Sequence, residues 1–370
     1  MKHFWSILTS AVILFGQSNN FFKIPVLNFN NRQDIQVIVD KETDIYLGHP
    51  STVLLEDGKT ILVVYPKGHG SGEIIYKRSL DGGKIWSNRL SVPENWSTSK
   101  EVPTIHRVID KNGKKRLIIW SGLYPARLAI SEDNGLTWSP LKKVGNWGGI
   151  VLMGSVVALK TSGHYLAMFH DDGRFITKDG KRTGIFTLYK TNSTDGGLTW
   201  SHPIGIYSNS KIHLCEPGIV RSPDGNQLAM LLRENSRTQN SQIMFSNNEG
   251  ETWSDPKELP LELTGDRHTV KYTKDKKLFI SFRDMAKNSP TKGDWVAWVG
   301  SYQDLTDNRL GEYRILIKNN YNEWDSSYPG VELLPTGEIV TTTYGHWTKG
   351  EMPYIMSVRL NLNEIKSILR

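Results

Sequence analysis

Short stretches of alternating apolar and polar residues fill most of this chain, and polar turns separate them. The stretches come in pairs, and the first member of each pair begins near residue 49, 102, 154, 216, 267 or 328. Alternation with a period of two, bounded by turns of the Asp-Gly type, predicts antiparallel β-hairpins. No stretch in this region keeps a helical period. The pattern therefore predicts an all-β protein built from six similar units.

A second repeat lies inside the first. The segments "SLDGGKIW", "SEDNGLTW", "STDGGLTW" and "SNNEGETW" begin at residues 79, 131, 193 and 246. All four fit the pattern S-x-[DN]-x-G-x-[TI]-W. The Asp or Asn side chain accepts hydrogen bonds from its own turn, Gly takes a positive φ, and Trp packs beneath the hairpin. We interpret the motif as a structural part of the fold and not as a ligand contact.

Six four-stranded units of this length predict a six-bladed β-propeller, because repeats of this period build closed arrays and closure hides the sheet edges. The propeller is expected to occupy residues 34–370 as one domain. Closure should join the chain ends, so Asp34–Asp40 is expected to pair beside Pro353–Leu362. A seven-bladed ring with one divergent unit is the main alternative, and the residue count argues against it.

Composition narrows the possible partners. The chain has 370 residues, of which 38% are hydrophobic and 10% aromatic, so it can bury a large core. The net charge is +7, but the basic residues are scattered and form no stripe for nucleic acid. A positive balance suits an acidic small substrate, and it equally suits an ordinary solvated surface.

The first 20 residues have a pattern of their own. Lys2 and His3 precede an apolar run from Phe4 to Phe15, and polar residues follow. This resembles a secretory signal peptide, although no small-x-small cleavage site is visible. The run is too short for a transmembrane helix. We expect an exported, periplasmic or extracellular monomer without a membrane span; Cys215 is the only cysteine, so no intrachain disulfide forms.

The predicted topology also says which residues meet. In a propeller, the starts of the first strands and the ends of the second strands gather at one rim of the central channel. The first-strand starts are His49, Glu101 or Val102, Gly154, Glu216, Arg267 and Tyr328; the second-strand ends are Lys67 to His69, Tyr124, His170 with Asp171 and Asp172, Arg233, Arg283 and His346. Such a set indicates a polar substrate pocket, and its arginines suit a carboxylate or sulfate.

The repeated turn is the Asp-box, and the layout from Tyr46 to Leu362 resembles the sialidase (neuraminidase) superfamily. The Asp-box is specific for the fold and weak for function. The stronger match lies in "CEPGIVRSPDGNQLAMLLREN", "LFISFRD" and "SSYPGVELLPTGEIVTTTYGHW". The resemblance implies that Tyr328 is the nucleophile, that Glu216 is its base, and that Arg233 and Arg283 bind the substrate carboxylate.

That pair of residues makes chemical sense. A phenol with a pKa near 10 is a poor nucleophile at neutral pH, and a neighbouring carboxylate can take its proton. A neutral nucleophile also avoids repulsion by the carboxylate that sialic acid carries at its anomeric carbon. The structural alternatives are that Tyr328 only lines the channel and that Glu216 and Arg233 form a buried ion pair.

The chain departs from the family in two places. His49, in "GHPS", stands where the family has its first arginine, and Gly345 and His346 stand where the family has the Glu that holds this arginine. Losing both together indicates a rebuilt pocket, since losing one alone would leave a charge unpaired. Arg267 and His268, in "GDRHT", are candidates to supply the cation.

The family's acid/base Asp is also missing, since "YPKGHGSGE" contains none. His69 can replace it, because histidine titrates near neutral pH. Asp171 and Asp172, in "FHDDGRF", are the other candidates, and each of the three residues can instead be a turn former. His170 and the other rim histidines are expected to contact substrate. The spacing of His and Asp supports no metal site.

The sequence thus predicts a cofactor-free glycoside hydrolase that removes a terminal acidic sugar, α-linked sialic acid, from a glycan. One alternative is a hydrolase of a different glycan with a histidine acid. The other is a propeller that binds glycans without catalysis. The sugar, its linkage and the stereochemistry of the reaction stay open.

Overall fold

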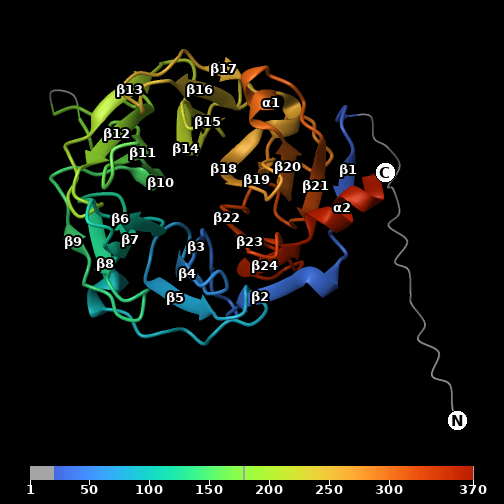
Figure 1. Ribbon diagram of the computed structural model, residues 1–370, viewed down its shortest axis with the longest axis horizontal. Helices are drawn as coiled ribbons and strands as arrows, with labels where there is room; N and C mark the ends of the chain where they lie inside the picture. The colour runs from blue at the N-terminus through green and yellow to red at the C-terminus, as the bar shows by residue number, and fades with distance from the viewer. Residues whose placement is uncertain (1–20, 178–179, 370) are drawn as a thin grey trace, which may run out of the picture.

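Six β-sheets surround a central channel in this computed structural model (Figure 1). The structure describes residues 21–177 and 180–369. Each sheet is one blade, and strands that follow one another along the chain within a blade pair antiparallel, because tight turns join them. The predicted six-bladed propeller is therefore confirmed, and the seven-bladed alternative is wrong.

The strands of the first three blades follow chain order. Blade one contains β3 (Ser51–Leu54), β4 (Ile61–Pro66) and β5 (Ile74–Ser79). Blade two contains β6 (Thr104–Ile109), β7 (Lys115–Ser121), β8 (Arg127–Ser131) and β9 (Lys142–Lys143). Blade three contains β10 (Ile150–Ala158), β11 (Tyr165–Asp171), β12 (Thr187–Ser193) and β13 (Ile204–Ser208).

The last three blades include both chain ends. Blade four contains β14 (Leu214–Arg221), β15 (Leu228–Glu234), β16 (Gln242–Ser246) and β17 (Lys257–Glu258). Blade five contains β18 (Gly265–Tyr272), β19 (Leu278–Asp284), β20 (Trp295–Gly300), β21 (Tyr313–Lys318) and β1 (Val26–Asn28). Blade six contains β22 (Gly330–Leu333), β23 (Ile339–Gly345), β24 (Tyr354–Leu360) and β2 (Gln36–Asp40).

Helices are few and short in the described part of the chain. The α-helices are α1 (Tyr302–Thr306) and α2 (Leu362–Leu369), and the 3₁₀ helices are η1 (Gln33–Ile35), η2 (Glu94–Thr98) and η3 (Leu261–Leu263). None of the described helices is long and apolar enough to cross a membrane. The predicted signal peptide, residues 1–20, lies outside the described residues.

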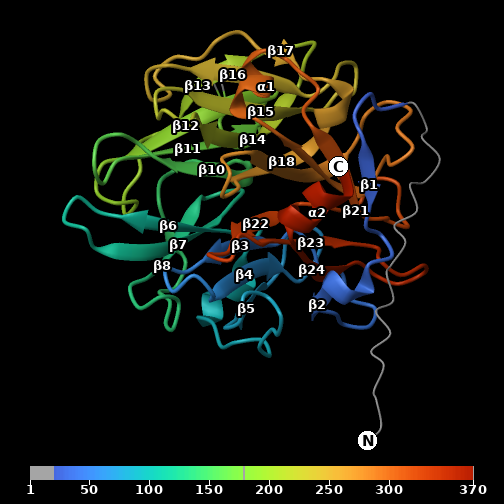
Figure 2. The same cartoon turned by 45° about the vertical axis from the view of Figure 1, so that its right-hand side comes forward.

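The two chain ends close the ring. β2 pairs antiparallel with β24, with Gln36 opposite Val358 and Val37 opposite Ser357, which confirms the predicted closure. β1 lies ahead of the expected domain start at residue 34 and adds a parallel strand to β21. Figures 1 and 2 show α2 beside β1 and β21, and Leu362 packs in the same hydrophobic cluster as Leu27.

The core lies between neighbouring blades. Leu62 and Val64 of β4 pack with Leu117 and Ile119 of β7, and comparable clusters fill the other blade boundaries. The second strand of a blade is therefore covered on both faces, and β11, β19 and β23 are buried along their whole length. This explains why β11 and β19 are mostly apolar in sequence, whereas β23 buries three threonines, Thr341, Thr342 and Thr343.

The four repeated turns follow the third strands of blades one to four and share one hydrogen-bond pattern. In the first turn, the Ser79 hydroxyl donates to Asp81 at 2.8 Å, and Asp81 accepts the N–H groups of Lys84 and Ile85 at 3.0 Å each. Gly82 and Gly83 take φ values of 70° and 81°. The final tryptophans pack into separate hydrophobic clusters; they are Trp86, Trp138, Trp200 and Trp253.

Candidate active site

Irregular backbone marks the rim where the inner strands begin. His49, Glu216, Arg267 and Ser327 have φ values of 54°, 53°, 55° and 57°, which non-glycine residues seldom adopt. Breaks in strand register follow these residues in blades four and five. Such bulges turn side chains out of the sheet pattern, and strained residues of this kind cluster at functional sites. The backbone here directs side chains toward the mouth of the channel.

Glu216 and Tyr328 meet at this rim. The Tyr328 hydroxyl donates to Glu216 Oε1 at 2.5 Å, and Arg233 Nη1 donates to the same oxygen at 2.8 Å. Glu216 begins blade four, Arg233 ends the second strand of that blade, and Tyr328 begins blade six. Glu216 and Tyr328 are buried, with 3% and 7% of their surface exposed. The propeller thus brings together three of the residues that the sequence selected.

Charge keeps this carboxyl ionised and this phenol protonated. Burial opposes the charge on Glu216, but Arg233 outweighs it and holds the pKa of the carboxyl below its ordinary value. Burial and the charge of Glu216 raise the pKa of the Tyr328 phenol well above 10. The other oxygen of Glu216, Oε2, is buried without a hydrogen bond from the described residues. The pair is therefore arranged as a proton donor next to a base.

A buried aspartate holds the arginines in place. Asp266 is fully buried; Arg237 binds both of its oxygens at 2.6 and 2.7 Å, and Arg283 binds one of them through Nε at 3.1 Å and Nη2 at 2.5 Å. Arg233 Nε lies 3.4 Å from the same carboxylate. Burial opposes ionisation, yet Arg233 and Arg283 lower the pKa of Asp266. With Glu216 included, three arginines outnumber two carboxylates, so the cluster is positive.

Arg283 is committed to the protein. Its Nη1 donates to the carbonyl oxygens of Trp324 and Ser326, and its other two nitrogens bind Asp266. It fixes the loop before Tyr328 and presents little of its guanidinium to a ligand. Arg233 is different, since it lines the pocket and its side chain keeps 18% of its surface exposed.

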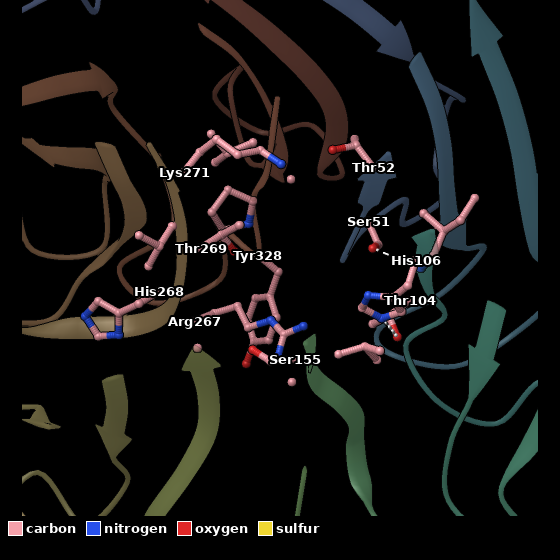
Figure 3. A pocket seen from close by; sticks show the side chains of 18 of the residues that line it. Ser51, Thr52, Thr104, His106, Ser155, Arg267, His268, Thr269, Lys271 and Tyr328 are labelled. Carbon is pink, nitrogen blue, oxygen red and sulfur yellow. Dashed lines mark hydrogen bonds between the residues drawn. The ribbon is translucent and has the colours of Figure 1, made fainter. Parts of the chain in front are cut away.

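The pocket at the rim has a volume of about 400 Å³. Its walls come from five blades and include His49, His69, Glu101, His170, Glu216, Arg233 and Tyr328. A second cavity, of about 230 Å³, lies within the channel, and Tyr328 lines both cavities (Figure 3). The rim pocket is large enough for a sugar and holds the charged groups on its walls.

Arg267 and His268 take different positions from those expected. Figure 3 shows Arg267 pointing into the channel cavity near Ser155, and His268 pointing away from it. Arg267 Nη2 donates to the Met153 carbonyl at 3.4 Å, and its buried Nη1 has no hydrogen-bond partner among the described residues. His268 is buried against Phe282, with Nε2 3.0 Å from the Leu263 carbonyl. His268 therefore supports the strand, whereas Arg267 carries a cation beneath the pocket.

His49, at the position expected for the family's first arginine, is linked through Tyr344 to Asp325. We call Asp325, Tyr46, His49, Tyr344 and His346 the Asp325 cluster. Asp325 Oδ1 accepts from Tyr46 at 2.7 Å and from Tyr344 at 3.1 Å, and Oδ2 lies 3.1 Å from His346 Nε2. His49 Nε2 lies 3.1 Å from the Tyr344 hydroxyl, and burial lowers the pKa of His49 well below 6.5. A neutral His49 and a buried carboxylate thus replace the expected Arg–Glu pair.

The three acid/base candidates separate clearly. His69 lines the pocket, and its side chain is 57% exposed. Asp171 accepts the N–H groups of Gly173, Phe175 and Ile176, and Asp172 pairs with Arg174 and Arg182 at 2.8 Å each; neither lines the pocket. The two aspartates organise their own loop, so the geometry favours His69.

His170 acts on Glu216 from behind. It is buried on the pocket wall, and its Nδ1 accepts the Glu216 backbone N–H at 3.4 Å. Burial lowers the pKa of His170 to about 4, so the ring is neutral and can accept this bond. His170 therefore helps to fix the left-handed backbone of Glu216.

Several important residues escaped the sequence reasoning. Glu101 lines the pocket and accepts the Val102 N–H at 2.9 Å, and burial raises its pKa to about 7. The sequence placed Glu101 or Val102 at the rim without a role. Asp266 directly precedes Arg267, and Asp325 lies three residues before Tyr328, so their nearness in sequence to predicted rim residues could have identified them. No sequence pattern marked Tyr46 or Tyr344 as part of the site.

Within residues 21–177 and 180–369, no group of three His, Cys, Asp or Glu side chains is arranged to hold a metal ion. The lone cysteine, Cys215, is a buried free thiol next to Glu216. Burial raises the pKa of this thiol well above its ordinary value, so it is neutral and does not compete as a nucleophile.

Comparison with known proteins supports the fold. Residues 114–282 match the family model of the BNR repeat-like domain. A Dyadobacter fermentans protein of unknown function superposes with a TM-score of 0.68 at 16% identity, covering 88% of this chain and 97% of that one. No curated protein sequence matches the chain.

Two sialidases are similar in the same way. The Hadza microbial sialidase Hz136 superposes with a TM-score of 0.62 at 17% identity, over 86% of this chain and 66% of that one. The intramolecular trans-sialidase from Ruminococcus gnavus, solved with oseltamivir carboxylate, gives 0.61 at 15% identity, over 87% and 95%. The predicted resemblance to the sialidase superfamily, with its BNR-repeat six-bladed propeller, is confirmed at the level of fold.

Proposed function

We propose that this sialidase-like propeller is an exo-acting glycoside hydrolase that removes a terminal acidic sugar, α-linked sialic acid, from glycans. One observation carries the proposal: a buried tyrosine hydroxyl donates a hydrogen bond to an ionised glutamate in a positively charged pocket. Tyr328 and Glu216 come from different blades, and a purely structural hydrogen bond does not require that the second carboxylate oxygen lack a partner among the described residues, as Glu216 Oε2 does.

The reaction begins with the pair itself. Tyr328 attacks the anomeric carbon and the glycosidic C–O bond breaks, so the leaving oxygen departs with the rest of the glycan and is protonated. The Tyr328 proton passes to Glu216 in the same step, so the phenolate never has to form as a free anion. Arg233 contacts both the base and the phenol oxygen, at 2.8 and 3.4 Å, and stabilises the negative charge that moves between them. The glycosyl–Tyr328 bond is then hydrolysed by water.

The substrate carboxylate is attracted by the surplus positive charge. Arg233 faces the pocket, and Arg267 lies beneath it without a carboxylate partner within 4 Å among the described residues. An unpaired buried guanidinium is costly in an empty protein and favours an anionic ligand. Arg283 supports binding indirectly, because it positions Asp266 and the loop before Tyr328.

The test is hydrolysis of an aryl α-sialoside by the wild type, Tyr328→Phe and the matched control Tyr302→Phe. Tyr302 is also buried, its hydroxyl donates to Gln227 at 3.0 Å, and neither residue lines the pocket. We expect turnover by the wild type and the control and loss in Tyr328→Phe. Full activity in Tyr328→Phe would remove Tyr328 as the nucleophile.

A second candidate rests on Glu101. Glu101 and Glu216 line one pocket. The pKa of Glu101 is raised to about 7, whereas the pKa of Glu216 lies below its ordinary value. Glycosidases that use two carboxylates need one protonated and one ionised. A hydrolase of a different glycan is therefore the runner-up; it predicts turnover of another glycan that survives Tyr328→Phe. Glycan binding without turnover would instead indicate a lectin-like propeller.

We also propose that residues 1–20 direct export and that the folded chain is a monomer. Fractionation of cells that express the full chain and a variant lacking residues 2–20 tests the first point. The full chain should leave the cytoplasm and the shortened chain should stay there. Light scattering on the purified protein tests the second point.

A further inference from the structure

A chain of three polar side chains leads from the buried carboxylate to the pocket. Tyr46 donates to Asp325 Oδ1 at 2.7 Å, and His69 Nδ1 lies 2.8 Å from the same Tyr46 oxygen. His69 Nδ1 also lies 3.7 Å from Asp325 Oδ1. Asp325 is 5% exposed, Tyr46 is half-buried, and the His69 side chain is 57% exposed. The order Asp325, Tyr46, His69 therefore runs from the interior to the pocket.

Counting protons fixes the direction of each bond. Burial raises the pKa of the Tyr46 phenol far above 10, so this residue has one proton to give. Asp325 Oδ1 accepts hydrogen bonds from both Tyr46 and Tyr344, so the Tyr46 proton points to Asp325. The Tyr46 oxygen can then only accept from His69, and His69 Nδ1 must carry a hydrogen. The other oxygen of Asp325, Oδ2, lies 3.1 Å from His346 Nε2, so the carboxylate is held from both sides.

This arrangement leaves one nitrogen of His69 for chemistry. In the described part of the chain, Nε2 makes no hydrogen bond, and the ring lines the wall that also holds Glu101 and Tyr328. His69 packs edge-on against Tyr46 and against His49, with ring centres 5.0 and 5.1 Å away, which limits its rotation. An oriented imidazole with a single open nitrogen is the arrangement that general acid/base catalysis requires.

We propose that Asp325 and Tyr46 are positioning residues that hold His69 as the general acid/base of this site, with Nδ1–H donated to Tyr46 and Nε2 turned to the substrate. The proposal rests on the proposed function and deepens it, because that function needs a proton donor for the leaving group. The same geometry assigns the Asp325 cluster a role, since it supports His69 where the family resemblance implies an Arg–Glu pair.

The steps balance. In the first, the Tyr328 oxygen bonds to the anomeric carbon, its proton moves to Glu216, and the glycosidic C–O bond breaks toward the leaving oxygen. That oxygen takes the proton from Nε2 of the His69 imidazolium, which becomes neutral with Nδ1–H in place. In the second, Nε2 takes a proton from water, the water oxygen bonds to the anomeric carbon, the Tyr328–carbon bond breaks, and Glu216 returns the phenol proton.

The first measurement does not need activity. Nitrogen-15 NMR of the histidine side chains reports which ring nitrogen carries hydrogen, and His69→Asn assigns the His69 signals. The NMR signals are followed as a function of pH, and titration of the groups around the His69 ring also affects them. These groups are Tyr46, Asp325 and His49, with Lys100 and Glu101 on the same wall of the pocket. We expect neutral His69 to carry hydrogen on Nδ1 in the wild type and to lose this preference in Tyr46→Phe. A wild type with hydrogen on Nε2 overturns the proposal.

The second measurement uses two aryl α-sialosides, one with a good leaving group that needs little protonation and one with a poor leaving group. Tyr46→Phe should lose at least about tenfold in kcat/KM on the poor leaving group and less than about threefold on the good one. Tyr344→Phe is the matched control: it also removes a phenol from Asp325 but does not touch His69. Its losses on the two substrates should be equal.

The outcomes separate the two proposals. A wild type that turns over no sialoside overturns the proposed function. An active wild type in which Tyr46→Phe affects both substrates equally overturns only the role of Tyr46 and Asp325. A selective loss in Glu101→Gln, with none in Tyr46→Phe or His69→Asn, also overturns it and makes Glu101 the acid. Selective loss in Tyr46→Phe and His69→Asn supports it.

Discussion

Carboxylates are used in two opposite ways in this propeller. In the repeated turns, Asp81 accepts from Ser79, Lys84 and Ile85, all within its own segment of chain. At the rim, Glu216 accepts from Tyr328, which lies 112 residues away, and one of its buried oxygens has no partner in the part of the chain that the structure describes. The turn carboxylate is satisfied locally, and the rim carboxylate is shared between blades and left incomplete.

The difference separates folding from chemistry. A carboxylate that its own turn satisfies can form as soon as the hairpin forms, so it stabilises a blade and does little else. A carboxylate whose hydrogen-bond partners come from distant blades gains those partners only when the propeller closes. An oxygen of such a carboxylate that has no partner is available to a substrate or a proton. Four changes to these side chains test the distinction.

The largest effect is expected at Glu216. Glu216→Gln keeps the shape of the side chain and removes the base, so kcat/KM on an aryl α-sialoside should fall on the order of 10³-fold. Steady-state kinetics on variants with matched circular dichroism checks this. Two results together would contradict this difference between rim and turn carboxylates. Glu216→Gln would keep more than a tenth of the wild-type kcat/KM, and the turn variant Asp195→Ala would lose as much kcat/KM as Glu216→Gln does.

Asp266 should have the largest effect on stability. Asp266→Asn leaves Arg233, Arg237 and Arg283 around a neutral side chain, and breaking a buried charge network of this kind costs about 3–5 kcal/mol. Urea unfolding, monitored by tryptophan fluorescence, measures the change. Asp81→Asn is the control, since its amide oxygen can still accept the turn bonds. Equal losses in the two variants would show that the rim network has no special weight.

Asp195 should matter for stability alone. Its side chain accepts from Leu198 and Thr199 at 3.0 Å each, and removing these bonds in Asp195→Ala should cost about 1–2 kcal/mol. Activity per folded molecule should stay within about twofold of the wild type, because the turn lies outside the pocket. Thermal unfolding and active-site titration measure the two quantities. A loss of activity in folded protein would contradict the structural role of the turn.

Glu101 should change the pH dependence of stability. Its pKa is raised from 4.5 to about 7, so the folded state binds this proton more tightly than the unfolded state does. The stability that this provides is complete below about pH 4.5 and is lost as the pH rises to about 7. Glu101→Gln should therefore be more stable than the wild type at pH 8 and nearly equal to it at pH 4.5. Parallel melting curves at every pH would contradict the raised pKa.

Much of the fold could be predicted from the sequence because its signals are local. The Asp-Gly turns and the alternation of β3 to β24 set the hairpins, and their spacing set six blades. Even the ring closure by β2 and β24 followed from the unit count. The extra strand β1 could not be foreseen, because a three-residue parallel strand has no turn and no alternation of its own.

The site was predicted only as far as register reaches. Strand starts and ends placed Glu216, Arg233 and Tyr328 at one rim, and the structure brings them together. Strand register does not determine which groups a side chain will hydrogen-bond. Arg283 was therefore expected to bind substrate, whereas its guanidinium bonds Asp266 and two backbone carbonyls. The Asp325 cluster was missed because it joins loops from both ends of the chain, and no local pattern records that meeting.

The proposed mechanism requires a covalent bond between Tyr328 and the sugar, and rapid-quench mass spectrometry detects this glycosyl–Tyr328 intermediate directly. An aryl α-sialoside with a very good leaving group makes the first step fast, so the intermediate accumulates before water attacks. We expect one sialosyl unit on the peptide that contains Tyr328 and none on the corresponding peptide of Tyr328→Phe. A sialosyl unit on another residue, or wild-type turnover by Tyr328→Phe, would contradict it.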